Sequence, residues 1–187
     1  MANHTLKAIM ENFELMLVEM PFSKVTVSAL VERSEISSNT FYYHFRDIYD
    51  LLDAWLAVKA EKYFHVTDGF SDWPEQLKTA MKAMQENARI VYHLFDSLPQ
   101  EHLERFAFGP LEEQFYEAAK RRTAGAPVSE KFVRSIAGIY SYSFFGFIAR
   151  FVWDHMKADV DEAVDTLKVI FVGLTEYMIA QDTGALD

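Results

Sequence analysis

Apolar residues recur at intervals of three and four along most of the chain, which is the spacing of amphipathic α-helices. The first apolar face covers residues 6–20, and Pro21 ends that helix. Two short helices are expected at 27–33 and 38–45, and Ser37 is well placed to cap the second of them. The first 46 residues therefore predict three short helices.

Longer amphipathic segments follow. Asp47 can cap the first of them, and Pro99 and Gly109-Pro110 are expected to mark breaks on either side of a short helical piece. The sequence shows no convincing strand. Further helices are expected at about 48–64, 74–95, 111–122, 128–156 and 161–180. We predict an all-α chain with a three-helix N-terminal domain at 1–46 and a larger helical domain at 47–187.

The spacing within residues 27–45 is typical of a helix-turn-helix, in which the second helix needs a bulky inner face and a polar or aromatic outer face. Phe41 and Phe45 lie one turn apart and can pack against the apolar residues of 27–31. The residues left facing outward are then Ser38, Asn39, Thr40, Tyr43 and His44. Thr40, Tyr42 and His44 suit phosphate oxygens, Ser38 and Asn39 suit base edges, and Tyr43 suits either.

The same segment resembles the TetR/AcrR family of transcriptional regulators. The resemblance covers about residues 6–55 and lies in PFSKVTV at 21–27, ISSNTFYYHFRD at 36–47 and YDLL at 49–52. It implies a DNA-reading headpiece, a dimer built mainly by the last two long helices, and repression relieved by a small ligand. The sequence FFGFIARFVW at 144–153 is similar, more loosely, to one subtype of the family's C-terminal domain.

Three positions depart from the family pattern. The family usually has glycine at the position of Glu35 and often at that of Asn39. Because glutamate adopts left-handed backbone angles poorly, the turn between the two helices of the motif could differ from the family's turn. The family often has lysine where this chain has Ile48. With Lys24 and Arg46 flanking the motif, the candidate DNA-binding residues are Lys24, Thr26, Ser37, Ser38, Asn39, Thr40, Tyr42, Tyr43, His44 and Arg46.

The negative net charge of the whole chain is the main argument against nucleic-acid binding. The chain has a formal net charge of −10, but residues 1–46 hold four lysines and arginines against five acidic residues, a net of −1. A near-neutral reader can bind DNA if its few cations face phosphates, although it should bind weakly away from its proper site. Cysteine is absent, no signal peptide is recognisable, and no apolar run approaches about 20 residues, so we expect a cytoplasmic protein with no membrane segment.

The C-terminal domain is rich in aromatic residues, most of which should form core or dimer interface. A minority could line an apolar cavity between helices for a small-molecule effector. A cavity needs a few polar groups among its apolar walls, and the candidates are Tyr92, His93, Tyr116, Tyr140 and Arg150. The last helix is apolar around much of its circumference, which favours burial on two sides and a homodimer.

We therefore predict a ligand-responsive repressor that binds a palindromic double-stranded DNA operator as a homodimer and is released by a small molecule. The alternative is a ligand-binding or interaction protein on the same fold that no longer reads DNA. An enzyme is disfavoured because His-Glu-x-x-His, Gly-x-Ser-x-Gly and phosphate-binding glycine loops are absent, and no histidine follows a glutamate by three residues. We expect no cofactor and no metal site.

Overall fold

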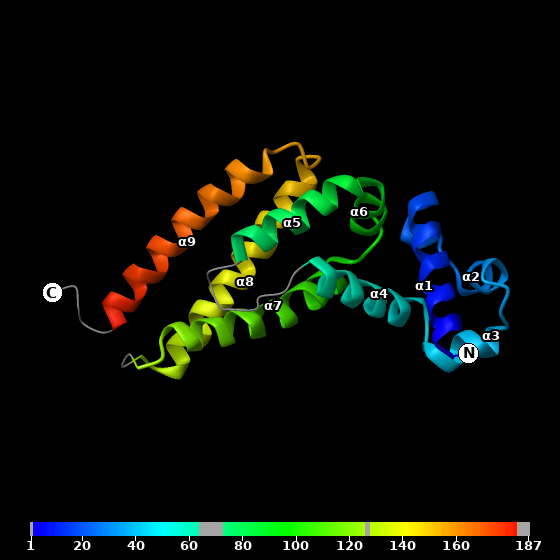
Figure 1. The fold of residues 1–187 in the computed structure, drawn as a ribbon, viewed down its shortest axis with the longest axis horizontal. Coiled ribbons are helices and arrows are strands. Elements are labelled where there is room, and N and C mark those ends of the chain that lie inside the picture. The colour runs from blue at the N-terminus through cyan, green and yellow to red at the C-terminus, as the bar shows by residue number, and fades with distance from the viewer. Residues whose placement is uncertain (1, 64–72, 126–127, 183–187) are drawn as a thin grey trace. The chain divides into compact units, whose positions relative to one another are not determined.

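The structure is a computed structural model that describes residues 2–63, 73–125 and 128–182 (Figure 1). Those residues form helices joined by short connections, without a strand, which confirms the all-α prediction. The elements are α1 (Ala2–Glu19), the 3-10 helix η1 (Phe22–Lys24), α2 (Val27–Arg33), α3 (Ser38–His44), α4 (Ile48–Tyr63), α5 (Trp73–Glu86), α6 (Ala88–Phe95), α7 (Gln100–Arg122), α8 (Glu130–Trp153) and α9 (Val160–Asp182).

The chain folds into two compact units. Unit 1 comprises residues 1–62 and 87–103, and unit 2 comprises residues 63–86 and 104–187. Unit 1 thus contains α1 to α4, α6 and the beginning of α7, whereas unit 2 contains α5, most of α7, α8 and α9. The functional boundary after residue 46 stays a prediction, because packing units need not coincide with functional domains.

The core of unit 1 forms around α1. Ile9, Phe13 and Leu17 lie at i, i+4 and i+8 on this helix and are completely buried. The Phe13 ring makes edge contacts with the rings of Phe22 and Trp55, with centroids 6.3 and 6.1 Å apart. Because these partners come from η1 and α4, one aromatic residue of α1 ties three elements of the unit together.

Helix α6 also belongs to unit 1, which the sequence did not lead us to expect. Its Ile90 and Leu94 are buried in the same core, and the Nδ1 atom of His93 lies 2.7 Å from the Leu17 carbonyl oxygen of α1. The apolar periodicity runs on through residues 74–95 and predicted one helix there. The structure instead divides it at Asn87, whose backbone is not helical, because α5 buries its apolar face in unit 2 and α6 buries its own in unit 1.

A second prediction was wrong at Gly109-Pro110, where α7 continues without interruption from Gln100 to Arg122. A proline within a helix removes one backbone hydrogen bond and crowds the preceding turn. In a helix of 23 residues the remaining backbone bonds are enough to keep the helix continuous. Pro99 does mark a boundary, since α7 begins directly after it.

Unit 2 is built on an aromatic cluster between α5, α7, α8 and α9. The Tyr140 ring lies 4.6 Å from that of Phe171 and 5.9 Å from that of Phe115, while Trp73 packs against Phe144 at 5.6 Å. All five residues are buried. The Tyr140 hydroxyl donates a hydrogen bond to the Phe171 carbonyl oxygen at 2.9 Å, so this buried polar group is satisfied.

Helix α8 meets the length and composition criterion for a membrane span, and among the described residues it is the only helix to do so. The sequence had led us to expect no such segment. The criterion is weak evidence, because core helices of soluble proteins pass it as well. Nine residues of α8 are buried, which is the pattern of a core helix, so the finding does not indicate a membrane protein.

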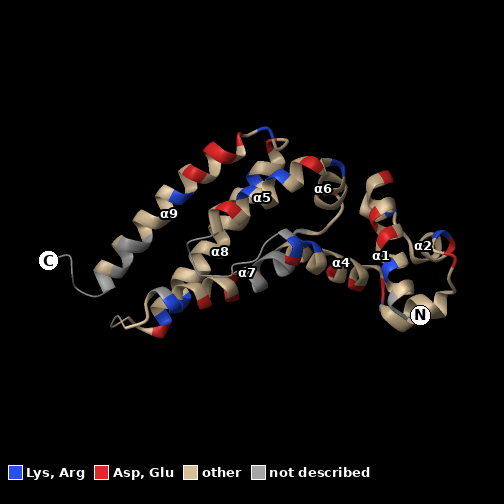
Figure 2. Cartoon of the chain, viewed as in Figure 1, with Lys and Arg blue, Asp and Glu red and all other residues tan. Residues whose placement is uncertain are grey.

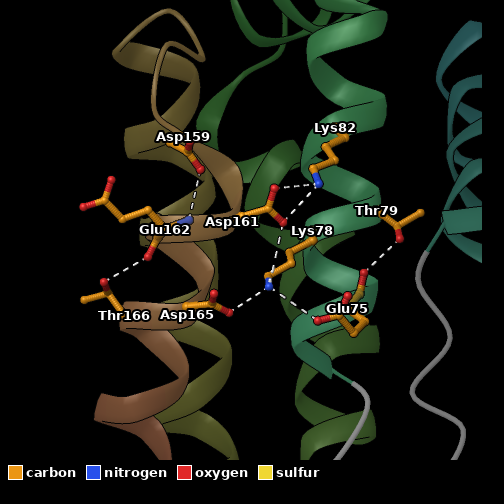
Figure 3. A network of polar contacts seen from close by, with 9 residues as sticks. All are labelled: Glu75, Lys78, Thr79, Lys82, Asp159, Asp161, Glu162, Asp165 and Thr166. Carbon is orange, nitrogen blue, oxygen red and sulfur yellow. Dashed lines mark hydrogen bonds and ion pairs between the residues drawn. The ribbon is translucent and has the colours of Figure 1, made fainter.

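Basic positions on α5 and acidic positions at the start of α9 are coloured in Figure 2. An ion-pair network joins these two helices (Figure 3). The Lys78 ammonium lies 2.7 Å from Asp165, 3.4 Å from Glu75 and 3.8 Å from Asp161, and Lys82 lies 2.8 Å from Asp161. The hydrogen bond that Lys78 donates to Asp165 raises the pKa of Lys78, and the hydrogen bond that Lys82 donates to Asp161 lowers the pKa of Asp161. The network holds opposite charges close enough to stabilise the α5–α9 contact.

We expect Lys78→Met to lower the stability of unit 2, and the loss should depend on pH. Lys78 adds to the larger effect of Lys82 in lowering the pKa of Asp161, so the attraction between Lys78 and Asp161 is present above the ordinary value of 3.8 and is lost as pH falls through the folded value. The raised pKa of Lys78 means that its contribution is present below 10.5 and is lost as pH rises further. Urea denaturation should show the largest difference from wild type between these limits.

Lys157→Met is the control, because Lys157 is exposed and takes no part in the network. A stability difference for Lys78→Met that stays constant from pH 3 to pH 7 would contradict an electrostatic role for the network.

Candidate nucleic-acid interface

The two helices of the motif are each started by a side-chain cap. The Thr26 hydroxyl accepts a hydrogen bond from the Ala29 amide at 3.2 Å, and the Ser37 hydroxyl accepts one from the Thr40 amide at 3.1 Å. Ser37 also lies 2.8 Å from the Thr40 hydroxyl. These bonds satisfy amides that the first helical turn leaves free, so both residues have a structural role independent of DNA.

The turn between α2 and α3 places Glu35 in the left-handed backbone region, with φ of 53°. A glycine adopts this conformation without steric cost, whereas a side chain with a Cβ does not. The chain therefore keeps a glycine-type turn despite carrying glutamate there. The Ile36 amide donates to the Val31 carbonyl across the turn at 3.0 Å, which helps to fix α3 against α2.

Replacing Glu35 with glycine should raise the free energy of unfolding of unit 1 by about 0.5–1 kcal/mol. Glycine relieves the strain of the left-handed backbone, and this gain exceeds the opposing effect of the higher entropy that glycine gives the unfolded chain. Glu35→Ala removes the same charge but keeps the Cβ, so it should give no comparable gain. Urea denaturation of the two variants measures the difference. Equal stabilisation by both would show that charge, and not backbone strain, is the cause.

Helix α3 has a buried face and an exposed face, as the sequence predicted. Phe41 is completely buried and Phe45 is 6% exposed, while Tyr43 is 81% exposed and Tyr42 is 57% exposed. Ser38 and Asn39 are exposed as well, but Thr40 and His44 are only half-buried. The most accessible surface of α3 is therefore formed by Ser38, Asn39, Tyr42 and Tyr43.

The arginines on either side of α3 are both held by carboxylates. Arg33 makes two hydrogen bonds to Glu19, at 2.6 and 2.8 Å. Arg46 binds Asp50 through its side chain at 3.0 Å and through its backbone amide at 2.9 Å. The hydrogen bonds raise the pKa of each arginine and lower that of its carboxylate partner. Lys24 is exposed at the end of η1 and makes no ion pair within the described residues.

The entry into α4 explains the departure at Ile48. The Asp47 carboxylate accepts hydrogen bonds from the amides of Tyr49 and Asp50 at 2.8 and 2.9 Å, so it caps α4 as predicted. Ile48 is half-buried and packs against the core of unit 1. A lysine at this position could reach a phosphate, whereas the isoleucine contributes apolar packing instead.

Asp50 was not identified from the sequence, although its position four residues after Arg46 is the usual spacing of a helical ion pair. Asp50→Asn should release the Arg46 side chain while still accepting from its backbone amide. We expect the slope of log affinity against log salt to steepen by about 0.9 per protomer, the value for one added phosphate contact. Fluorescence anisotropy with a DNA duplex at several salt concentrations measures the slope.

Glu32→Gln is the matched control for Asp50→Asn. It removes one negative charge from exposed α2 without releasing a cation. An identical slope for both variants would mean that Arg46 does not reach a phosphate.

The five candidate effector-binding residues fall in both units. Tyr92 and His93 belong to unit 1, and Tyr116, Tyr140 and Arg150 belong to unit 2. Tyr116 is buried, with its hydroxyl 3.1 Å from Glu130 and the Arg134 guanidinium 4.1 Å from its ring centre. Arg150 is exposed and binds Asp154 at 2.6 Å, whereas Tyr140 on the same helix is buried. Of the three candidates in unit 2, Tyr116 and Tyr140 are buried, and Tyr140 belongs to the aromatic cluster.

Comparisons with known proteins agree with this arrangement. Residues 16–55 match the family model for bacterial regulatory proteins of the tetR family, and residues 71–173 match the model TetR_C_8, a transcriptional regulator C-terminal region. No curated protein matches the chain. A solved structure titled "Dihydroxyacetone kinase operon activator DhaS" is 15% identical, with a TM-score of 0.62 over 96% of this chain and 98% of that one, which shows a shared fold. The chain therefore belongs to the TetR family of DNA-binding transcriptional regulators.

Proposed function

We propose that this regulator is a cytoplasmic homodimeric repressor that binds a palindromic operator through α3 and is released by a small molecule. The observation that carries DNA reading is the shape of α3, a seven-residue helix anchored by buried Phe41 that exposes two tyrosines, an asparagine and a serine. A helix with a purely structural role has no need for this exposed aromatic and polar face. Repression is the simplest consequence of a bound dimer covering its operator.

An exposed apolar surface on the last two helices supports the dimer. On α9 the side chains of Val169 and Tyr177 are 74% and 59% exposed, and both share a face with Gly173. On α8, Tyr142 is 66% exposed and shares a face with Gly146. Beyond the nearby backbone of its own helix, a Cβ atom added at either glycine would meet no atom within 4 Å, so both positions leave room for a partner helix. Exposed apolar side chains on both helices favour a protein interface there.

The effector site is proposed in unit 2, where Tyr116 of α7 and Tyr140 of α8 are buried and the Tyr140 ring packs against that of Phe115. Each hydroxyl already has a protein partner, so a ligand that binds there must compete for it. Such competition would shift α7 or α8, and a ligand that favours one arrangement of these helices shifts the population that binds DNA.

The first experiment is selection of the purified protein against random duplex DNA, followed by titration of the enriched sequence with wild type and with Asn39→Ala, Tyr43→Ala. Enrichment of a palindrome whose binding is lost in the double variant supports the proposal. If no sequence is enriched even at low salt, the protein is not a DNA-binding regulator in its present form. The headpiece, whose two arginines are held by carboxylates, would then belong to a ligand-binding helical protein.

A further inference from the structure

The side chains that α3 exposes are unusual for a DNA reader because none carries a full positive charge. The helix reads Ser-Asn-Thr-Phe-Tyr-Tyr-His and contains neither arginine nor lysine. Guanine is most often read by arginine or lysine donating to its O6 and N7 atoms in the major groove. The nearest arginines along the chain, Arg33 and Arg46, are held by Glu19 and Asp50. The usual means of reading guanine is therefore missing from this helix.

Asn39 and Tyr43 occupy the centre of the exposed face. They lie one helical turn apart, opposite the buried Phe41, so both point the same way from the helix. Within the described residues the Asn39 amide makes no hydrogen bond, and the Tyr43 ring touches only that of His44, at 5.1 Å. Both side chains are thus available to a ligand that approaches this face.

The chemistry of this pair fits one kind of base pair. An asparagine amide can accept from the N6 amino group of adenine and donate to its N7 atom at the same time. The thymine methyl group is the one apolar group on the major-groove edge, and apolar or aromatic side chains pack against it. We propose that α3 reads A·T base pairs, with Asn39 on adenine and Tyr43 on a thymine methyl group. This inference rests on the proposed function, because it specifies the DNA that the same site would bind.

Tyr42 supplies a matched control on the same helix. It is also exposed, but it lies 100° around the helix from Phe41 and packs its ring edge against the Phe41 ring at 5.4 Å. Its hydroxyl suits a phosphate oxygen, and phosphate contacts weaken or strengthen binding to all sequences alike. Tyr42→Ala and Tyr43→Ala therefore remove the same group from neighbouring positions with different expected consequences.

The test begins with the sequence enriched from random duplexes. Each thymine of the half-site is replaced by deoxyuridine, which removes only the methyl group, and each adenine by 7-deazaadenine, which removes only N7. At one thymine we expect wild-type binding to weaken about fourfold, the worth of one buried methyl group. The loss should be absent in Tyr43→Ala and unchanged in Tyr42→Ala. At one adenine we expect a loss of roughly tenfold in wild type and none in Asn39→Ala.

Two results would overturn the inference and leave the proposed function standing. One is an enriched half-site whose Asn39- and Tyr43-dependent positions are G·C pairs. The other is equal binding of thymine and deoxyuridine duplexes by the wild-type protein. Failure to enrich any duplex would overturn the proposed function itself, and the base preference with it. The thermal unfolding temperatures of Asn39→Ala, Tyr42→Ala and Tyr43→Ala should match that of wild type. This control shows that weaker DNA binding is caused by a lost contact and not by a folding defect.

Discussion

Phe41→Ala should destabilise unit 1 by about 3–5 kcal/mol, the usual effect of removing a fully buried phenylalanine. The Phe41 ring is completely buried, and it packs against Phe45 at 5.7 Å and against Tyr42 at 5.4 Å. Replacement by alanine leaves a cavity beneath α3, a helix of only seven residues that cannot persist without tertiary contacts. DNA binding should be lost together with the fold of this helix.

Hydrogen exchange resolved along the chain is the appropriate measurement, because the two compact units need not unfold together. Amides of α1 to α3 should exchange faster in Phe41→Ala, while those of α8 should keep their wild-type protection. Tyr43→Ala is the control, since it removes an aromatic ring that is 81% exposed and should change stability by less than about 0.5 kcal/mol. Equal effects of the two changes would refute the assignment of Phe41 as the anchor of α3.

The features of the headpiece that could be predicted from sequence are those set by local chemistry. The caps at Ser37 and Asp47 and the burial of Phe41 all follow from residue type and spacing within a few positions. Helix length is less predictable, because the tendency of proline to end a helix is local and a long helix can continue through it. The uninterrupted passage of α7 through Gly109-Pro110 is an example.

Features that depend on packing between distant segments were not predictable. Nothing in the periodicity of residues 74–95 shows that its second half packs in unit 1 with His93 against Leu17. The same limit applies to the effector candidates. Arg150 and Tyr140 were chosen as polar groups near aromatic residues, but their positions on α8 place one in solvent and the other in the core. The carboxylate partners of Arg33 and Arg46 lie 14 and 4 residues away, and only the second spacing is a recognisable signal.

The consequence for DNA binding is that both arginines of the headpiece are already paired with carboxylates of the protein. A reader whose arginines are paired internally has little general attraction for phosphates, so more of its affinity must come from base contacts. Such a reader gains from dimerisation more than a basic one does, because two specific half-site contacts must replace missing electrostatic attraction.

The dimer should therefore be essential, and Val169→Glu should abolish it. Val169 is 74% exposed on α9 and shares its face with Gly173 and Tyr177, so a partner helix would cover it. In a two-fold interface the substitution buries two unpaired carboxylates, which we expect to raise the dimer dissociation constant by at least about 100-fold. Sedimentation velocity over a range of protein concentrations measures this constant.

Val58→Glu is the matched control, because Val58 is 56% exposed on α4 of unit 1 and lies outside the proposed interface. It should leave the dimer intact while adding the same charge. A wild-type protein that sediments as a monomer, or a Val169→Glu variant that remains dimeric, would refute the interface on α8 and α9. If Val169→Glu is monomeric and folded, its affinity for a full palindrome should fall to that for a single half-site, since only one α3 can then engage each duplex at a time.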